Sequence, residues 1–282
     1  MLKKDLSWHF PGSPEEAAAL VRGNKGYQYH AGGTGILRNK SSAAAGFVDL
    51  SQTCLEGVHF SQEKIEIGSM TNFTDTAGGE SPSSSCPMAL ISRAAGTAAS
   101  TPLRHRITVG GSIADSPPWS DLTAVLTAAE AEVFIISRDG KEQALPFIDY
   151  YHQKKDLRES LITKITLPKE KGNVYCYKRF TRVVMDYQLF SLALIGTKKQ
   201  NKINDISCSA TGGKKVFISL DEVRDFLTGK DIDPDMLKTA AEKVPFDFSD
   251  SPGFSAEYKF HLFKTLLKDG LFEFAGIGEE DI

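Results

Sequence analysis

The sequence predicts an α+β protein with two domains. The chain has 282 residues, which is enough for two domains that each bury a core. Two glycine-rich segments, 31–35 and 108–112, each follow a segment with the pattern of a strand. From residue 174 on, strand patterns come first and helical patterns follow, and this order is typical of an α+β domain.

The N-terminal part of the chain is expected to begin with a helix. Ser13 and Pro14 are typical residues of a helix start, and Gly23 ends the pattern. Next we expect a strand, a second element after the first glycine-rich turn, a further strand and a β-hairpin, at 26–30, 36–39, 46–51 and 56–70. Alternating residues in the hairpin place Ile65 and Ile67 on one face.

The middle of the chain begins with a segment rich in Ser, Thr, Gly and Pro, 71–87, which predicts an exposed loop. This loop is either a mobile cover or an inert surface excursion. The Ala-rich segment 88–100 is expected to be helical. A strand at 103–109 is expected to lead into the second glycine pair and a Pro-rich turn. A helix and three strands should follow, at 123–131, 132–137, 140–151 and 160–168.

A domain boundary is expected at 168–172, where the sequence is polar and turn-forming. The predicted domains are therefore 1–170, with subdomains of about 1–56 and 57–170, and 171–282. The second domain should contain strands at 174–180, 189–196, 203–213 and 214–219, and helices at 221–229, 234–244 and 255–269. In the last helix, the expected apolar stripe is Tyr258, Leu262, Phe263, Leu266 and Leu267.

The composition is that of an ordinary globular protein, with 41% hydrophobic and 24% charged residues. A net charge of −3 gives no electrostatic reason to expect nucleic acid or an anionic membrane as a partner. The longest apolar run, 189–195, is too short to span a bilayer, and no signal peptide is recognisable, so we expect a cytoplasmic protein. The four cysteines show no metal-ligand spacing and are expected to be reduced and mostly buried.

Common catalytic motifs are absent from the sequence. It contains no phosphate loop of the form GxxxxGK[ST], no HExxH and no GxSxG, and the six histidines show no paired spacing. What remains is the pair of glycine-rich segments, "AGGTG" and "TVGGS". Exposed N–H groups of two such turns, with the hydroxyls of Thr34 and Ser112, would suit the two phosphates of a dinucleotide. Two purely structural turns are the alternative, and the residues alone leave both open.

The two segments and their surroundings resemble the FAD-binding medium subunit of molybdenum hydroxylases, the xanthine dehydrogenase and carbon monoxide dehydrogenase flavoprotein family. This family has a first loop of the form AGGT and a second of the form T-[IV]-GG-N, followed by a Pro-rich turn and an aspartate. The chain offers "AGGTGI" and "TVGGSIADSPPWSD". Segments such as "IEIGSMT", "LITKITLP" and "YCYKRFTRVVMD" also look like family segments in the family's order, so the resemblance covers essentially the whole chain.

The resemblance implies a fold and a set of cofactor contacts. The first domain would be a two-part FAD-binding domain of the vanillyl-alcohol oxidase-like (PCMH) type, and the second an α+β domain like the C-terminal domain of carbon monoxide dehydrogenase flavoprotein. Asp121 stands where the family's aspartate helps to hold the cofactor, and Lys178 and Arg182 take its basic positions near the flavin. The positions expected to contact FAD are Ala31, Gly32, Gly33, Thr34, Gly35, Ile36, Thr108, Gly110, Gly111, Ser112, Asp121, Ile162 and Lys178.

The resemblance also implies partners. A large subunit with a molybdenum cofactor would oxidise the substrate, and a small iron–sulfur subunit would carry the electrons to FAD, which passes them to NAD or another acceptor. The chain itself then needs no catalytic residue and no metal, because the flavin supplies the redox chemistry.

Three positions differ from the family pattern. Ser112 stands where asparagine is usual, His105 stands where asparagine commonly follows the arginine, and Gly35 stands where an acidic or polar residue is common. A lost hydrogen bond to the cofactor would cost about 1 kcal/mol. These positions support an alternative hypothesis, a scaffold or assembly subunit of the same fold with weakened FAD binding. A third hypothesis, a self-sufficient flavin oxidase, would need a substrate base, and the sequence nominates none.

Overall fold

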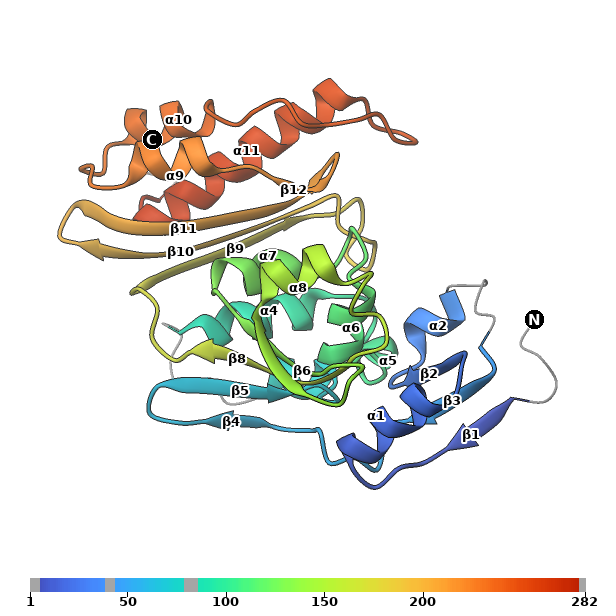
Figure 1. The fold of residues 1–282 in the computed structure, drawn as a ribbon. Helices are drawn as coiled ribbons and strands as arrows, with labels where there is room; N and C mark the ends of the chain where they lie inside the picture. The colour runs from blue at the N-terminus through green and yellow to red at the C-terminus, as the bar shows by residue number, and fades with distance from the viewer. Residues whose placement is uncertain (1–5, 39–43, 79–85, 279–282) are drawn as a thin grey trace. The chain divides into compact units, whose positions relative to one another are not determined.

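The computed structural model describes residues 6–38, 44–78 and 86–278, which form two compact units (Figure 1). The first unit contains the described residues of Met1–Gly79, Ala99–Pro117 and Glu130–Leu167. The second contains those of Glu80–Ala98, Pro118–Ala129 and Pro168–Ile282. The second unit therefore combines the C-terminal part of the chain with two segments from its middle. The expected division into domains at 170 and 171 stays a prediction.

The first unit begins with a small parallel sheet of order β1-β3-β2, formed by Ser7–His9, Gly46–Asp49 and Tyr27–His30. Helix α1 (Pro14–Gly23) packs on this sheet and begins as predicted, because the Ser13 hydroxyl accepts a hydrogen bond from the N–H of Glu16 at 3.2 Å. The glycine-rich turn after β2 leads into a short helix, α2 (Thr34–Arg38). The predicted strands at this end of the chain are confirmed.

The larger sheet of the first unit has the order β4-β5-β8-β6-β7. Its strands are Val58–Phe60, Lys64–Gly68, Leu161–Pro168, Glu132–Ile136 and Glu142–Pro146. Strands β4 and β5 form the predicted antiparallel hairpin. Ile65 and Ile67 are both fully buried, which confirms that they share the core face.

Three predictions in the middle of the chain are corrected. The expected loop at 71–87 contains helix α3 (Phe73–Gly78), because the Asn72 side chain accepts from the N–H of Asp75 at 2.9 Å and Phe73 is buried. The part of this loop at 79–85 lies outside the described residues. The expected strand at 140–151 stops at Pro146, and Phe147–Gln153 form helix α8.

The expected strand at 103–109 is also wrong. Thr101–Arg104 form helix α5, and Val109–Asp115 form helix α6. The second glycine pair therefore lies in the first turn of a helix, whose N-cap is Thr108. The Thr108 hydroxyl accepts a hydrogen bond from the N–H of Gly111 at 3.1 Å, which stabilises the helix start over an extended chain.

The second unit is built on an antiparallel sheet of order β12-β11-β10-β9. The strands are Val216–Ile218, Lys202–Gly213, Phe190–Lys199 and Val174–Phe180, and all four were predicted. Its helices are α4 (Pro87–Thr97), α7 (Asp121–Ala128), α9 (Asp221–Leu227), α10 (Pro234–Ala241) and α11 (Ala256–Ala275). Helices α9, α10 and α11 lie over one face of the sheet and α4 and α7 over the other (Figure 1), so strand β10 is buried from Phe190 to Gly196.

The stripe of α11 differs in part from its prediction. Phe263 and Leu267 are fully buried, as predicted, but Tyr258 is 50% exposed. The stripe passes instead through Lys259, whose ammonium donates to the carbonyl of Ser249 at 2.9 Å. The aliphatic part of a lysine can line a core when its ammonium group has a partner. A prediction based on apolar residues alone does not include such a lysine.

All four cysteines are free thiols, and Cys86 and Cys176 are buried as expected, whereas Cys54 is exposed. Among the described residues, no three His, Cys, Asp or Glu side chains are grouped as a metal site would need. Within the same residues, no helix has the length and apolar character needed to cross a membrane.

Candidate functional site

The structure brings the two glycine-rich segments together within the first unit. A Cβ atom placed on Gly32 would lie 1.4 Å from the carbonyl oxygen of Arg106, just before the second segment. A Cβ on Gly111 would lie 4.0 Å from the Cβ of Ala31. The Nε of Arg106 also donates to the carbonyl of Gly32 at 3.2 Å. The two backbones can approach this closely because position 32 has no side chain.

The first segment has the conformation of an open turn. Gly33 has a φ of +77°, in the left-handed region that favours glycine. Among the described residues, no acceptor outside helix α2 is recorded for the N–H groups of Gly32, Gly33, Thr34 and Gly35. The hydroxyl of Thr34 likewise has no recorded partner there. This turn therefore offers a set of donors to an anion.

The second segment differs from the first. The N–H groups of Val109 and Gly110 donate to the carbonyls of Thr71 and Ser69, at 2.9 and 2.8 Å. Those of Gly111 and Ser112 donate to the side chain and the carbonyl of Thr108. The expectation of exposed N–H groups is therefore wrong for this segment, because Thr108 caps its helix and the backbone of Val109 and Gly110 lies against residues 69–71.

A Cβ on Gly110 would lie 2.5 Å from the Cβ of Ser69, so glycine is needed for this contact as well. The N–H of Ser69 in turn donates to the carbonyl of Thr163 in β8 at 2.9 Å. The second segment is thus fixed to the larger sheet and forms a rigid support beside the first turn. Ile162, the next predicted contact, is buried in β8 beside this support.

Two side chains that the sequence analysis did not nominate lie at the first turn. Arg106 contacts it from the segment before α6, as described above. His30, the last residue of β2, lies against it from the sheet, and a Cβ on Gly33 would be 3.0 Å from the His30 Nε2. The sequence signals for them are the basic residues of "LRHRITVGG" and the histidine before "AGG". Neither signal shows that the side chain contacts the first turn, because that contact depends on the fold.

Asp121 lies in the second unit, where it begins helix α7 and is buried. Its Oδ1 accepts a hydrogen bond from the Tyr177 hydroxyl at 3.1 Å and lies 3.1 Å from the Arg179 Nε in an ion pair. Burial raises the pKa of Asp121 to about 6, although Arg179 and Tyr177 both act to lower it. Burial, with Asp121 beside it, also raises the pKa of Tyr177 well above its usual value, so its hydroxyl remains a donor.

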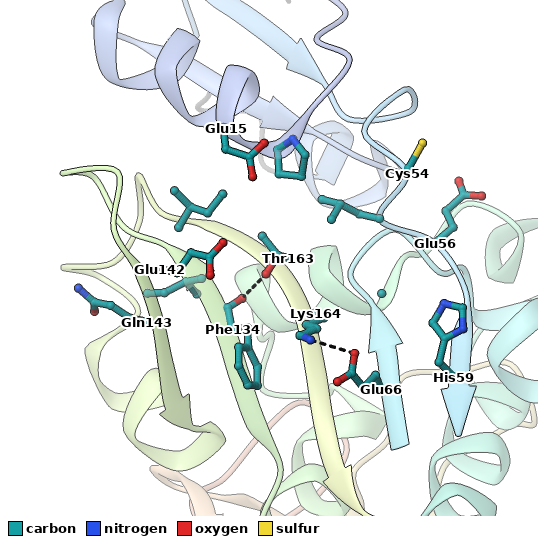
Figure 2. A pocket seen from close by; sticks show the side chains of 15 residues that line it. Glu15, Cys54, Glu56, His59, Glu66, Phe134, Glu142, Gln143, Thr163 and Lys164 are labelled. Carbon is teal, nitrogen blue, oxygen red and sulfur yellow. Dashed lines mark hydrogen bonds and ion pairs between the residues drawn. The ribbon is translucent and has the colours of Figure 1, made fainter. Parts of the chain in front are cut away.

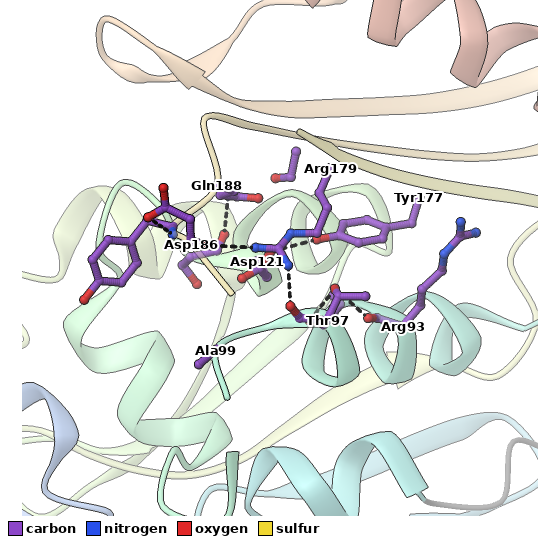
Figure 3. A network of polar contacts seen from close by, with 12 residues as sticks. Arg93, Thr97, Ala99, Asp121, Tyr177, Arg179, Asp186 and Gln188 are labelled. Atoms are coloured by element: carbon purple, nitrogen blue, oxygen red, sulfur yellow. Dashed lines mark hydrogen bonds and ion pairs between the residues drawn. The ribbon is translucent and has the colours of Figure 1, made fainter. Parts of the chain in front are cut away.

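Arg179 is the centre of this polar network (Figure 3). Its guanidinium donates to the carbonyl of Thr97 at the end of α4, and to the carbonyl of Asp186 at 3.1 Å. Asp121 therefore helps to hold α4, α7 and the connection after β9 together. Its contact with FAD stays a prediction.

The two other basic positions of the second unit have partners of opposite charge. Lys178 forms an ion pair with Glu273 of α11, which also lies 3.5 Å from Arg93. The Nε of Arg182 lies 2.7 Å from the Asp186 carboxylate, and the Arg182 side chain is 63% exposed. Both pairs lie within the second unit, and a role near the flavin remains an expectation for each.

Two family models match the chain. Residues 4–170 match the model of the FAD binding domain in molybdopterin dehydrogenase, and residues 175–274 match the CO dehydrogenase flavoprotein C-terminal domain. The chain belongs to the family of FAD-binding medium subunits of molybdenum hydroxylases. FAD is the cofactor of this flavoprotein family, and its members are subunits of oxidoreductases.

Two relatives of this flavoprotein are medium chains of dehydrogenases, and each matches it over most of the length of both chains. It is 28% identical over 250 residues to the glyceraldehyde dehydrogenase medium chain of Sulfolobus acidocaldarius, covering 86% of this chain and 88% of that one. It is 25% identical over 253 residues to the carbon monoxide dehydrogenase medium chain of Hydrogenophaga pseudoflava, covering 86% of both.

Solved structures show the same fold. A chain of carbon monoxide dehydrogenase from H. pseudoflava superposes with a TM-score of 0.87 and 21% identity, over 98% of this chain and 99% of that one. A chain of quinoline 2-oxidoreductase from Pseudomonas putida 86 also gives 0.87, with 20% identity over 98% and 99%.

The flavoprotein also has a pocket of about 320 Å³ on the larger sheet, beside the start of α1 (Figure 2). Four glutamates line it, and one of them, Glu66, is paired with Lys164 at 2.9 Å. In the described part of the chain, Glu15, Glu56 and Glu142 have no recorded ion pair. An acidic lining repels a pyrophosphate, so this pocket is a poor place for the phosphates of FAD.

Proposed function

We propose that this flavoprotein is the electron-transfer subunit of a molybdenum hydroxylase complex, with a large molybdenum subunit and a small iron–sulfur subunit as partners. The family models and the medium-chain relatives support this assignment. When bound, FAD supplies the redox chemistry that accepts electrons from the iron–sulfur subunit and delivers them to NAD or another acceptor. The chain itself has to bind the cofactor and orient it.

The observation that carries the proposal is the open turn at 31–35, packed against the second segment. Pyrophosphate needs several donors in a small space, and unengaged N–H groups of a glycine turn supply them without a side chain in the way. The Thr34 hydroxyl and the Arg106 guanidinium would add one further donor and one positive charge. The residues present therefore fit the diphosphate part of FAD, with Gly32, Gly33 and Thr34 as its main contacts.

Titration of the purified chain with FAD tests the proposal. We expect Gly33→Val to abolish binding, because valine is strained at a φ of +77° and its side chain would meet His30. Gly23→Ala is the matched control, since a Cβ at Gly23 meets nothing within 4 Å, and it should bind FAD normally. Circular dichroism shows whether each variant is folded. A folded wild-type chain that takes up no flavin, alone or co-expressed with its partners, would contradict the proposal.

One observation favours the scaffold alternative. The N–H groups of the second segment are already engaged within the protein, so only one of the two turns offers free donors. Weak FAD binding would follow, and the chain would then serve assembly. The activity of the complete complex separates the two functions: loss of electron transfer in the Gly33→Val complex supports the electron-transfer subunit, and unchanged activity supports the scaffold.

A further inference from the structure

We infer that His30, held by Asp49, is a further cofactor-binding residue whose imidazole contributes a hydrogen-bond donor and a positive charge to the binding of the FAD pyrophosphate. This inference rests on the proposed function. It assigns a charge to the first turn that no glycine or threonine can provide.

The position of the pair in the sheet is the first support. His30 and Asp49 are the last residues of the parallel strands β2 and β3, and they are partners in the register of these strands. Ligands of parallel sheets bind beyond the carboxyl ends of the strands, which is where both side chains stand. The first glycine-rich turn begins at the next residue, Ala31.

The orientation of the imidazole is the second support. His30 Nδ1 lies 2.9 Å from the Asp49 Oδ2, and both side chains are largely buried, with 17% and 14% exposed. A carboxylate partner keeps a proton on Nδ1, so Nε2 is the nitrogen left for the turn. Nε2 is also the atom nearest to the Cβ position of Gly33.

Rigid packing holds this arrangement. The Trp8 ring meets the imidazole edge-on, with centroids 5.0 Å apart, and Phe47 lies 6.0 Å away on the same sheet. The second carboxylate oxygen of Asp49 accepts the N–H of Ser51 at 2.9 Å. The imidazole therefore has one defined position beneath the turn.

The charged groups around His30 are two acids and an arginine. Burial opposes the ionisation of Asp49, but hydrogen bonds from Ser51 and His30 keep its pKa below the usual value, so it is a carboxylate at neutral pH. Arg106 carries a positive charge, and Asp115, whose Oδ2 would lie 3.3 Å from a Cβ on Gly35, is the other acid at the turn. From β1, the uncharged Trp8 contacts the imidazole, whereas the Nε2 of His9 lies 3.1 Å from the Tyr27 hydroxyl.

The pyrophosphate diester of FAD is an anion. An N–H at Nε2 adds one donor next to it, and the imidazolium adds one positive charge beside that of Arg106.

The test is the dissociation constant of FAD, followed by flavin fluorescence at neutral pH. In His30→Gln, binding should weaken about tenfold or more, as for loss of a charge-assisted hydrogen bond. Asp49→Asn should weaken binding in the same direction, which keeps the test decisive if one variant does not fold.

The chain provides a matched control in His59. Its Nε2 would also lie 3.0 Å from a Cβ on a glycine of positive φ, Gly57, but it has no Asp partner and is not at the turn. His59→Gln should bind FAD like the wild type.

ADP serves as a second probe because it contains the pyrophosphate without the flavin. Competition by ADP should weaken in His30→Gln, and binding of riboflavin should not change. Equal FAD affinity in wild type and His30→Gln would overturn the inference while leaving the proposed function intact. A wild-type chain that binds no FAD would instead overturn the proposed function.

Discussion

At the scale of single residues, the close packing around the first turn depends on glycines, which have no side chain. Gly32 and Gly110 allow backbones to touch, and the contacts that forbid a Cβ come from Arg106 and Ser69, more than 70 and about 40 positions away in the chain. The motif "AGGTG" therefore predicts a tight turn, but only the neighbours show why each glycine is required.

Asp121 gives a prediction about pH. Its pKa is raised to about 6 by burial, above its value of about 3.9 in an unfolded chain, so the folded state binds more protons between these values. The contribution of Asp121 to the free energy of unfolding must therefore fall as the pH rises from about 4 to about 6, by roughly 3 kcal/mol.

Urea unfolding of the wild-type chain and of Asp121→Asn at several pH values in this window measures the effect. The difference in free energy of unfolding between the two proteins should change with pH in the stated direction and become constant above about pH 7. A constant difference over the whole range would show that Asp121 ionises normally in the folded chain.

At the scale of elements, the sequence predicts those helices and strands that are determined by residues close together in the chain. Helix α1 has its capping serine and Pro14, and the strands of the second unit have long apolar patterns, so these elements were predicted. For the second glycine pair, the sequence predicts a turn that follows a strand at 103–109. In the structure, the cap formed by Thr108 and the contact with Ser69 stabilise a helix there. The contact with Ser69 joins residues that are distant in the chain, so local patterns do not reveal it.

Arg179 joins three elements of the second unit and provides the prediction at this scale. Arg179→Met leaves the buried Asp121 carboxylate without its ion pair and two carbonyls without a donor, so we expect a loss of about 3–5 kcal/mol in the free energy of unfolding. Arg182→Met removes an exposed pair and should cost at most about 1 kcal/mol. Denaturant unfolding at neutral pH measures both, and equal losses would contradict the role given to Arg179.

At the scale of the whole molecule, cofactor binding and stability are linked. A ligand that binds only the folded chain stabilises it by mass action, by about 2.7 kcal/mol at a hundredfold excess over its dissociation constant. FAD should therefore raise the melting temperature of the purified flavoprotein. Riboflavin, which has no pyrophosphate, should raise it much less, and Gly33→Val should show no FAD-dependent rise. A rise of equal size with riboflavin would move the main contacts away from the first turn.

The sequence by itself determined the α+β class, most helices and strands, the absence of common catalytic motifs and the two glycine-rich segments, whose resemblance to a known family indicated FAD. These features depend on residues close together in the chain, where capping, periodicity and glycine content act locally. The tertiary structure decided that the first segment presents free N–H groups while the second serves as its support. It also placed Arg106 and His30 at the turn and put α4 and α7 into the second unit. These results depend on contacts between distant residues, which local patterns do not specify.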